Sequence, residues 1–300
     1  MDLSQNKNNN RNKLYALLTF VTGLVASVFI LNNINDNWQH LREHDLQNLV
    51  EAHATSVEQS VSRSVSSAKI VAAWLNSHNG EISGFDDFAK EVIISMDGIT
   101  NLQLAPNGIV KHIYPLAGNE KAIGHNILKD DKRISEAKLA VLSNKLTLSG
   151  PYELIQGGIA IIGRQPIFFD KASANNSNSS PNKHYFWGFA SVLISLETLL
   201  LESSLSELEK QGDSFQLWKY SADTGEKDIF YKNTAENVSE HVQATMEMPN
   251  AIWYLNIEES LKLEHDPELF VSAIILFLFD ILLACSVYQY LSNRKVKFTN

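Results

Sequence analysis

The residues that could do chemistry are scattered along this sequence and form no recognisable motif. The nine histidines give no H-x-x-E-H or H-E-x-x-H pattern, and no G-x-S-x-G nucleophile turn occurs. His40 and His44 stand one helical turn apart and could share a metal, but a solvated helix face explains the pair better. The one cysteine, Cys285, can form neither an intrachain disulfide nor a thiolate metal site. We therefore expect no enzyme, no cofactor and no metal.

One charged residue interrupts an apolar run. Arg164 lies within the strand-like segment 159–169, and its planar guanidinium could clamp an anionic ligand. The alternative is an internal salt bridge with Glu120 or Glu153. The nearby Gln-Gly-Gly at 156–158 lacks the lysine and hydroxyl of a phosphate loop, so a tight turn explains its glycines better.

The composition separates the possible classes of protein. The chain has 300 residues, 44% of them apolar, and a net charge of −9, with 34 acidic against 25 basic residues. An acidic chain repels a phosphate backbone, so we expect no nucleic-acid partner. The apolar content is enough for packed cores and excludes a disordered or fibrous chain.

The apolar residues are concentrated at the two ends. Leu14 to Leu31 is an uncharged run that would make a helix of about 27 Å, close to the thickness of a hydrocarbon core. Leu269 to Leu291 is longer and contains one charge, Asp280. We expect transmembrane helices at 14–34 and 269–291. A signal peptide is the alternative for the first, although its Asn-rich end is a poor cleavage site.

Basic residues predict the orientation. Lys7, Arg11 and Lys13 precede the first span, and Arg294 and its neighbours follow the second. Under the positive-inside rule the tails 1–13 and 292–300 are cytoplasmic and residues 35–268 are periplasmic, in an inner membrane. The tails are short, so we expect the output module to be a separate protein.

The periplasmic segment begins with a long amphipathic helix, expected at 36–77. Its apolar residues repeat every seven positions in two series, which are Val50, Val57, Ser64 and Val71, and Ala54, Val61, Ala68 and Leu75. Such a seam can pack on the domain's own core or pair with a second subunit. We favour a homodimer through this helix.

Alternating patterns then predict two sheets. Asn107-Gly108 between apolar runs is a strong hairpin signal. The fold class is therefore α+β, with two tandem PAS-like antiparallel-sheet units between the membrane helices. We place these parts at 78–195 (membrane-distal unit), 196–211 (connecting helix) and 212–262 (membrane-proximal unit).

Several short motifs together resemble the signature of the CHASE domain, a ligand-sensing module of bacterial, plant and slime-mould receptors. They are Ala-Pro-x-Gly (105–108), Tyr-Pro-Leu-x-Gly-Asn-Glu (114–120), Ala-Ile-Gly (122–124), Ser-Gly-Pro (149–151), Gln-Gly-Gly (156–158) and Gly-Arg-x-Pro (163–166). The resemblance implies a small-molecule ligand in the membrane-distal unit and a signal that crosses the membrane.

The polar residues in or next to these motifs are the expected ligand-binding site: Tyr114, Asn119, Glu120, Tyr152, Gln156 and Arg164. Tyr114 and Tyr152 could instead pack the core. In the second span Asp280 is the expected membrane relay, because a buried carboxyl favours contact with a partner helix. Gly23-x-x-x-Ser27 in the first span offers a surface for close approach. The alternative is that Asp280 is protonated and merely tolerated.

Two functions remain open. The first is a membrane-anchored sensor that relays ligand binding to a separate output protein, or the sensor half truncated from a diguanylate cyclase or histidine kinase. The second is an envelope adaptor that binds another protein and no small ligand.

Overall fold

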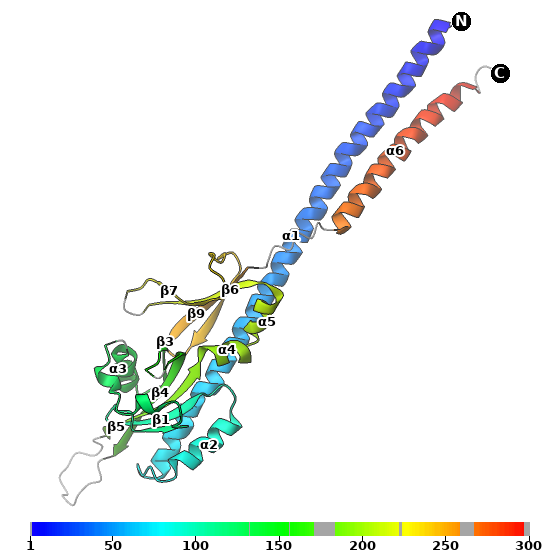
Figure 1. Ribbon diagram of the computed structural model, residues 1–300. Coiled ribbons are helices and arrows are strands. Elements are labelled where there is room, and N and C mark those ends of the chain that lie inside the picture. The colour runs from blue at the N-terminus through cyan, green and yellow to red at the C-terminus, as the bar shows by residue number, and fades with distance from the viewer. Residues whose placement is uncertain are drawn as a thin grey trace, which may run out of the picture. The chain divides into compact units, whose positions relative to one another are not determined.

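The structure of the chain is a computed structural model. The residues it describes are 2–131, 133–155, 157–170, 184–221, 224–258 and 267–296. They form two units, residues 1–45 with 261–300 and residues 46–260. Helix α1 (Asp2–Ser77) is continuous from the first apolar span through the expected stalk, so it contributes to both units (Figure 1).

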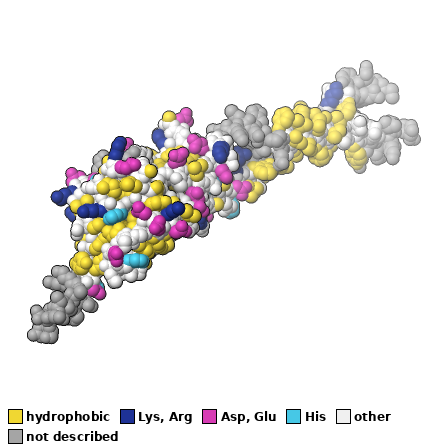
Figure 2. Space-filling view, turned by 60° about the horizontal axis from the view of Figure 1, so that its bottom comes forward, with side chains coloured by type: hydrophobic (Ala, Val, Ile, Leu, Met, Phe, Trp, Pro, Cys, Tyr) yellow, Lys and Arg dark blue, Asp and Glu magenta, His cyan; other side chains and the backbone are white. Residues whose placement is uncertain are grey.

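The first unit contains the beginning of α1 and helix α6 (Pro267–Val296). Both helices are long and apolar enough to cross a membrane. Large apolar side chains such as Val25 and Phe29 on α1 and Leu282 on α6 are exposed, and Figure 2 shows the hydrophobic surface that they help to form. A lipid bilayer would cover such a surface, as expected for transmembrane segments.

The second unit contains two antiparallel sheets. The first has the strand order β2-β1-β5-β4-β3, with β1 Asn101–Pro106, β2 His112–Tyr114, β3 Thr147–Glu153, β4 Ile159–Asp170 and β5 His184–Ser195. The second has the order β7-β6-β9-β8, with β6 Ser214–Tyr220, β7 Lys227–Lys232, β8 Gln243–Met248 and β9 Ala251–Glu258. The segments around the first sheet form two helices and two short 3-10 turns. These are α2 (Phe85–Ser95), α3 (Ile134–Ser143), η1 (Glu120–Ala122) and η2 (Ile127–Lys129). The α+β prediction with two sheet units is confirmed.

Two glycine-containing turns in the first sheet are as the sequence predicts. Asn107 and Gly108 both have positive φ, 53° and 76°, between β1 and β2. Gly157 and Gly158, at φ 103° and 79°, turn the chain between β3 and β4. The Gln-Gly-Gly segment is thus a strand connection, although Gln156 itself lies outside the described residues.

The apolar seam of α1 packs against its own domain. All eight seam positions are buried, and the seven apolar ones share one core with residues of both sheets, including Leu102, Ile161 and Leu255. Side chains of α1 also reach the edge strand β8, where the carboxylate of Glu58 accepts a hydrogen bond from the backbone N–H of Glu247 at 3.0 Å. The chain's own sheets therefore cover these positions, so the seam follows the first of the two interpretations, and a homodimer through another face of this helix stays a prediction.

The connecting helix differs from the single helix expected at 196–211. It is two helices, α4 (Leu196–Glu202) and α5 (Leu205–Gln211), because the chain turns at Ser203 and Ser204, where φ of Ser204 is +59°. The Ser195 hydroxyl caps α4 by accepting a hydrogen bond from the Thr198 N–H at 3.0 Å. Serine favours caps and turns over helix interiors, and the leucine stripe hides this break.

Polar contacts join the two sheets near β3. The Asn250 side chain bonds both backbone groups of Leu148, at 2.6 and 3.0 Å. The Lys219 ammonium donates to the Gly150 carbonyl at 2.6 Å. These bonds fix β3 of the first sheet to the second sheet.

Candidate ligand-binding site

A row of polar side chains crosses the first sheet on the face that α3 covers. Thr147, Arg164, Ser191 and Gln103 are register partners on β3, β4, β5 and β1. Side chains alternate between the faces of a strand, so partners in one row share a face. Two residues further along each strand, Phe189 and its neighbours pack with Ala137 and Ala140 of α3 in the smaller core. The other face packs on α1.

Arg164 is buried on this face and has no carboxylate partner among the described residues. It is 1% exposed, and its Nη1 donates to the hydroxyl of Ser149 at 2.6 Å, while Nε has no hydrogen-bond acceptor. Burial lowers the pKa of the guanidinium to about 10, so it stays charged at neutral pH. The salt bridge to Glu120 or Glu153 that the sequence left open is absent from the described structure, and both glutamates are exposed.

Two further polar atoms near Arg164 are buried, Tyr152 Oη and Ser191 Oγ, and Ser191 Oγ has no hydrogen-bond partner among the described residues. Burial, then the charge of Glu136 and a hydrogen-bonding interaction with that carboxylate, raise the pKa of the Tyr152 phenol, while the positive charge of Arg164 opposes the shift. The phenol therefore keeps its proton and can donate it in a hydrogen bond. Potential donors from β3, β4 and β5 thus lie in one region, where Arg164 Nε and Ser191 Oγ have no partner in the described part of the chain.

Arg133 closes one side of this region. Its Nη2 donates to the Glu153 carbonyl at 2.9 Å, its Nε lies 3.4 Å from the Asp130 carboxylate, and its guanidinium lies 5.4 Å from the centre of the Tyr152 ring. His125 Nε2 lies 3.2 Å from Nη1, and burial and then the Arg133 charge lower the pKa of this imidazole. Arg133 thus ties the loop before α3 to β3. This role could not be predicted, because Arg133 follows a run of other charged residues.

Asn119 reaches the same face through a chain of buried amides. Its Oδ1 accepts from Asn101 Nδ2 at 3.1 Å, and Asn101 Oδ1 accepts from Gln103 Nε2 at 3.0 Å. Gln103 is the register partner of Ser191. Asn101 and Gln103 were missed in the sequence, although two amides alternating with leucines could have indicated a polar inner face.

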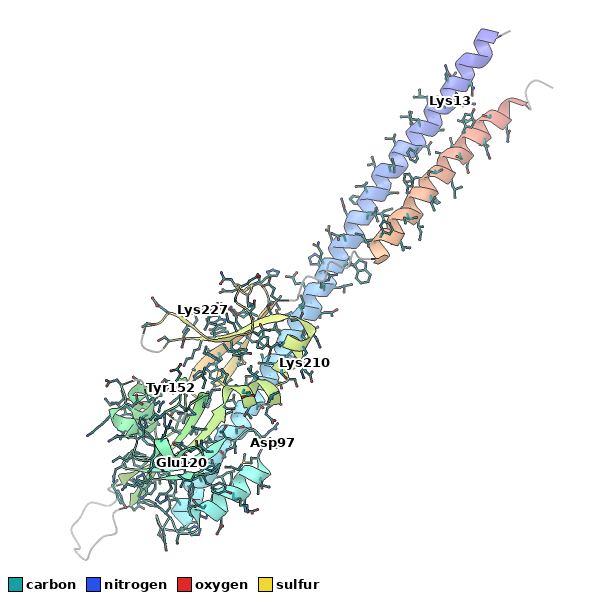
Figure 3. All side chains as sticks on the ribbon, in the orientation of Figure 1. Lys13, Asp97, Glu120, Tyr152, Lys210 and Lys227 are labelled. Carbon is teal, nitrogen blue, oxygen red and sulfur yellow. The ribbon has the colours of Figure 1, made fainter. Side chains whose placement is uncertain are left out.

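The expected site residues are therefore only partly brought together. Asn119, Tyr152 and Arg164 share the α3 face. Tyr114 pairs with Leu102 and so lies on the opposite face, where it packs against the main core. Glu120 is exposed at the start of η1, well apart from Tyr152 (Figure 3).

Asp280 makes its contacts within the membrane unit. It is 3% exposed, and its Oδ2 accepts a hydrogen bond from the Ser27 hydroxyl at 2.8 Å. A Cβ on Gly23 would lie 2.5 Å from Oδ1, so the glycine makes room for the carboxylate. The Gly23-x-x-x-Ser27 surface receives α6 of the same chain.

Comparison with known proteins decides the family. A family model described as the CHASE domain matches residues 69–231, more than half of the chain. The chain belongs to the CHASE domain family. The match covers the polar face of the first sheet and extends to β7. CHASE domains are extracellular sensory domains, and with two helices that could cross a membrane this fits a membrane protein with a periplasmic domain.

Solved structures similar to this CHASE protein are sensory domains as well. An extracellular ligand-binding receptor from Desulfohalobium retbaense has a TM-score of 0.52 at 11% identity, over 71% of this chain and 39% of the receptor chain. The sensory domain of the Campylobacter jejuni chemoreceptor Tlp3 (TM-score 0.47, 13% identity) is covered to 96%, over 75% of this chain. The Vibrio cholerae histidine kinase DctB sensor domain (0.45, 9%) is covered to 100%, also over 75%. No curated protein matches the sequence.

Proposed function

We propose that this CHASE protein is a membrane-anchored sensor that binds a small anionic ligand on the α3 face of the first sheet. The observation that carries this proposal is the buried Arg164 charge. A buried cation without a carboxylate is costly unless another group compensates it. Ser191 Oγ, which has no partner among the described residues, and the Tyr152 phenol, which interacts with Glu136, add two more donors nearby. A carboxylate or phosphate would satisfy all three.

The proposed site comprises Asn119, Tyr152 and Arg164 from the sequence prediction, together with Ser191. Tyr114 and Glu120 are left out because of where they lie. Gln156 borders the turn between β3 and β4 but lies outside the described residues.

The proposed relay passes through α1 and α6 to a separate output protein. Helix α1 extends without interruption from the core of the sensor unit into the first apolar span. The contact of Asp280 with Ser27 couples α6 to α1. On the basic flanking residues we keep both termini in the cytoplasm, residues 35–268 in the periplasm and the membrane spans at 14–34 and 269–291.

The ligand can be sought in fractionated cell extract. We expect the anionic small-molecule fraction, separated by anion exchange, to raise the melting temperature of the full chain in detergent, because binding to the folded state stabilises it. The cationic and neutral fractions should not raise the melting temperature by binding at Arg164. A shift that the neutral fraction gives equally in the wild type and in Arg164→Gln would contradict an anion at Arg164. An adaptor that binds only protein would respond to no fraction.

A further inference from the structure

A groove lies at the end of strands β4 and β5, beside α4, α5 and strand β7 of the second sheet. Its volume is about 720 Å³, within the range of small-molecule sites. One wall is formed by the end of the first sheet, including Ala160 and Ser195. These two residues are four positions along their strands from Arg164 and Ser191, about 13 Å at about 3.3 Å per residue. The groove therefore adjoins the Arg164 region, since Asn119 also lines it, but its Ala160 and Ser195 wall lies well along the sheet from Arg164.

The other wall comes from α4, α5 and β7. It contributes Leu200, Leu201, Phe230 and Tyr231. Leu201 is 61% exposed, so this wall presents apolar surface to solvent. Because the chain turns at Ser203 and Ser204, side chains from both short helices line the groove. One straight helix would present only a single row of side chains to it.

The charges of the groove have one sign. Glu197 of α4 and Glu209 of α5 line it, and no lysine, arginine or histidine occurs among its described lining residues. Neither carboxylate has a cationic partner in the described part of the chain. Glu209 and Tyr231 both line the groove, and burial and then the Glu209 charge raise the pKa of the Tyr231 phenol.

We propose that this groove binds a small organic cation, a protonated amine attached to an apolar or aromatic body. The ammonium group would lie between Glu209 and the face of Tyr231, which attract it as an ion pair and through a cation–π contact. The apolar body would pack on Leu200 and Phe230. An anion is repelled there, so this ligand differs in class from the one proposed at Arg164.

A ligand in this groove would touch both sheet units. It would contact the first sheet through Ala160 and Ser195 and the second through β7. If the amine binds one arrangement of the two sheets more tightly, it changes the affinity for the anion proposed at Arg164, and the anion changes the affinity for the amine by the same factor. The groove is then a second input to the sensor.

Phenethylamine, which is protonated at neutral pH, is the probe, and its neutral analogue 2-phenylethanol is the matched control. Binding to the full chain in lipid nanodiscs is measured by saturation-transfer NMR titration, with empty nanodiscs subtracted. We expect saturable binding of the amine, at least about tenfold weaker binding of the alcohol, and weakening of amine binding by salt. Glu197→Gln/Glu209→Gln should weaken amine binding by about tenfold or more.

Glu207→Gln is the matched variant, because Glu207 lies on α5 and does not line the groove. It should bind the amine as the wild type does, and so should Arg164→Gln. The proposal is overturned if the amine shows no saturable binding, if the alcohol binds equally well, or if the double variant binds unchanged. None of these results bears on the anionic ligand at Arg164, so the two proposals fail separately.

Discussion

Gly163→Val should destabilise the sensor unit by about 3 kcal/mol, the upper range for overpacking a core. A Cβ at Gly163 would lie 2.9 Å from Val65 Cβ on α1 and 2.9 Å from Val192 Cγ1 on β5. Both neighbours are buried and β-branched, so neither can move aside easily. Strand propensity alone would favour valine over glycine and would stabilise the strand. The steric clash therefore decides that the substitution lowers the free energy of unfolding.

The measurement is the melting temperature of the full chain in detergent, followed by tryptophan fluorescence. For a unit of this size about 3 kcal/mol corresponds to roughly 6–12 °C. The matched control is Ile159→Val on the same strand, where the side chain is 43% exposed and the change should be small. An unchanged melting temperature in Gly163→Val would show that α1 does not pack this closely on β4.

Gly23→Leu should separate the two membrane helices. The leucine would occupy the space of the Asp280 carboxylate and break its hydrogen bond from Ser27. Such interhelical bonds contribute only about 0.6–1.7 kcal/mol, so loss of close packing should be the larger effect. Spin labels at the exposed Leu18 and Leu282, in a Cys285→Ser background, report the separation. We expect a narrow distance distribution in the parent and a broad, longer one in Gly23→Leu.

Two controls separate packing from charge. Val25→Leu changes an exposed position of the same helix and should leave the distribution narrow. Asp280→Asn keeps an acceptor for Ser27 and should also leave it narrow, whereas Asp280→Leu should broaden it. If Asp280→Leu and Gly23→Leu both give the parent distribution, the helices do not depend on this contact, and Asp280 is merely tolerated.

The strands were predictable because their signals are local. Asn107 and Gly108 mark one turn by their tolerance of positive φ, and period-two alternation marks the strands on either side. The short helix α2 was missed, because its eleven residues were treated only as the start of the first sheet unit.

The apolar seam of α1 shows that a sequence pattern does not identify the surface on which a helix packs. A heptad series records that Val57 and Val61 are buried, but not whether a second chain or the chain's own sheets cover them. The covering residues, such as Leu255, are some two hundred positions away. Placement of site residues has the same limit, since Tyr114 differs from Ile113 only by strand parity, and that parity puts it on the α1 face.

The central claim is that the Arg164 region binds an anion through groups that the unliganded protein leaves without partners. Tyr152→Phe and Ser191→Ala test it most directly, because each removes a buried hydroxyl beside Arg164. Ser191 Oγ has no partner among the described residues, so its removal should leave the melting temperature unchanged or raise it when no ligand is present. The Tyr152 phenol also interacts with Glu136, and its removal should change the melting temperature little. The affinity for the anion, measured by calorimetry, should nevertheless fall, by about tenfold for each and by about 100-fold for Arg164→Gln. Glu120→Gln should bind as the wild type does. If both variants lower the melting temperature and bind the anion unchanged, these atoms serve the fold and the ligand binds elsewhere.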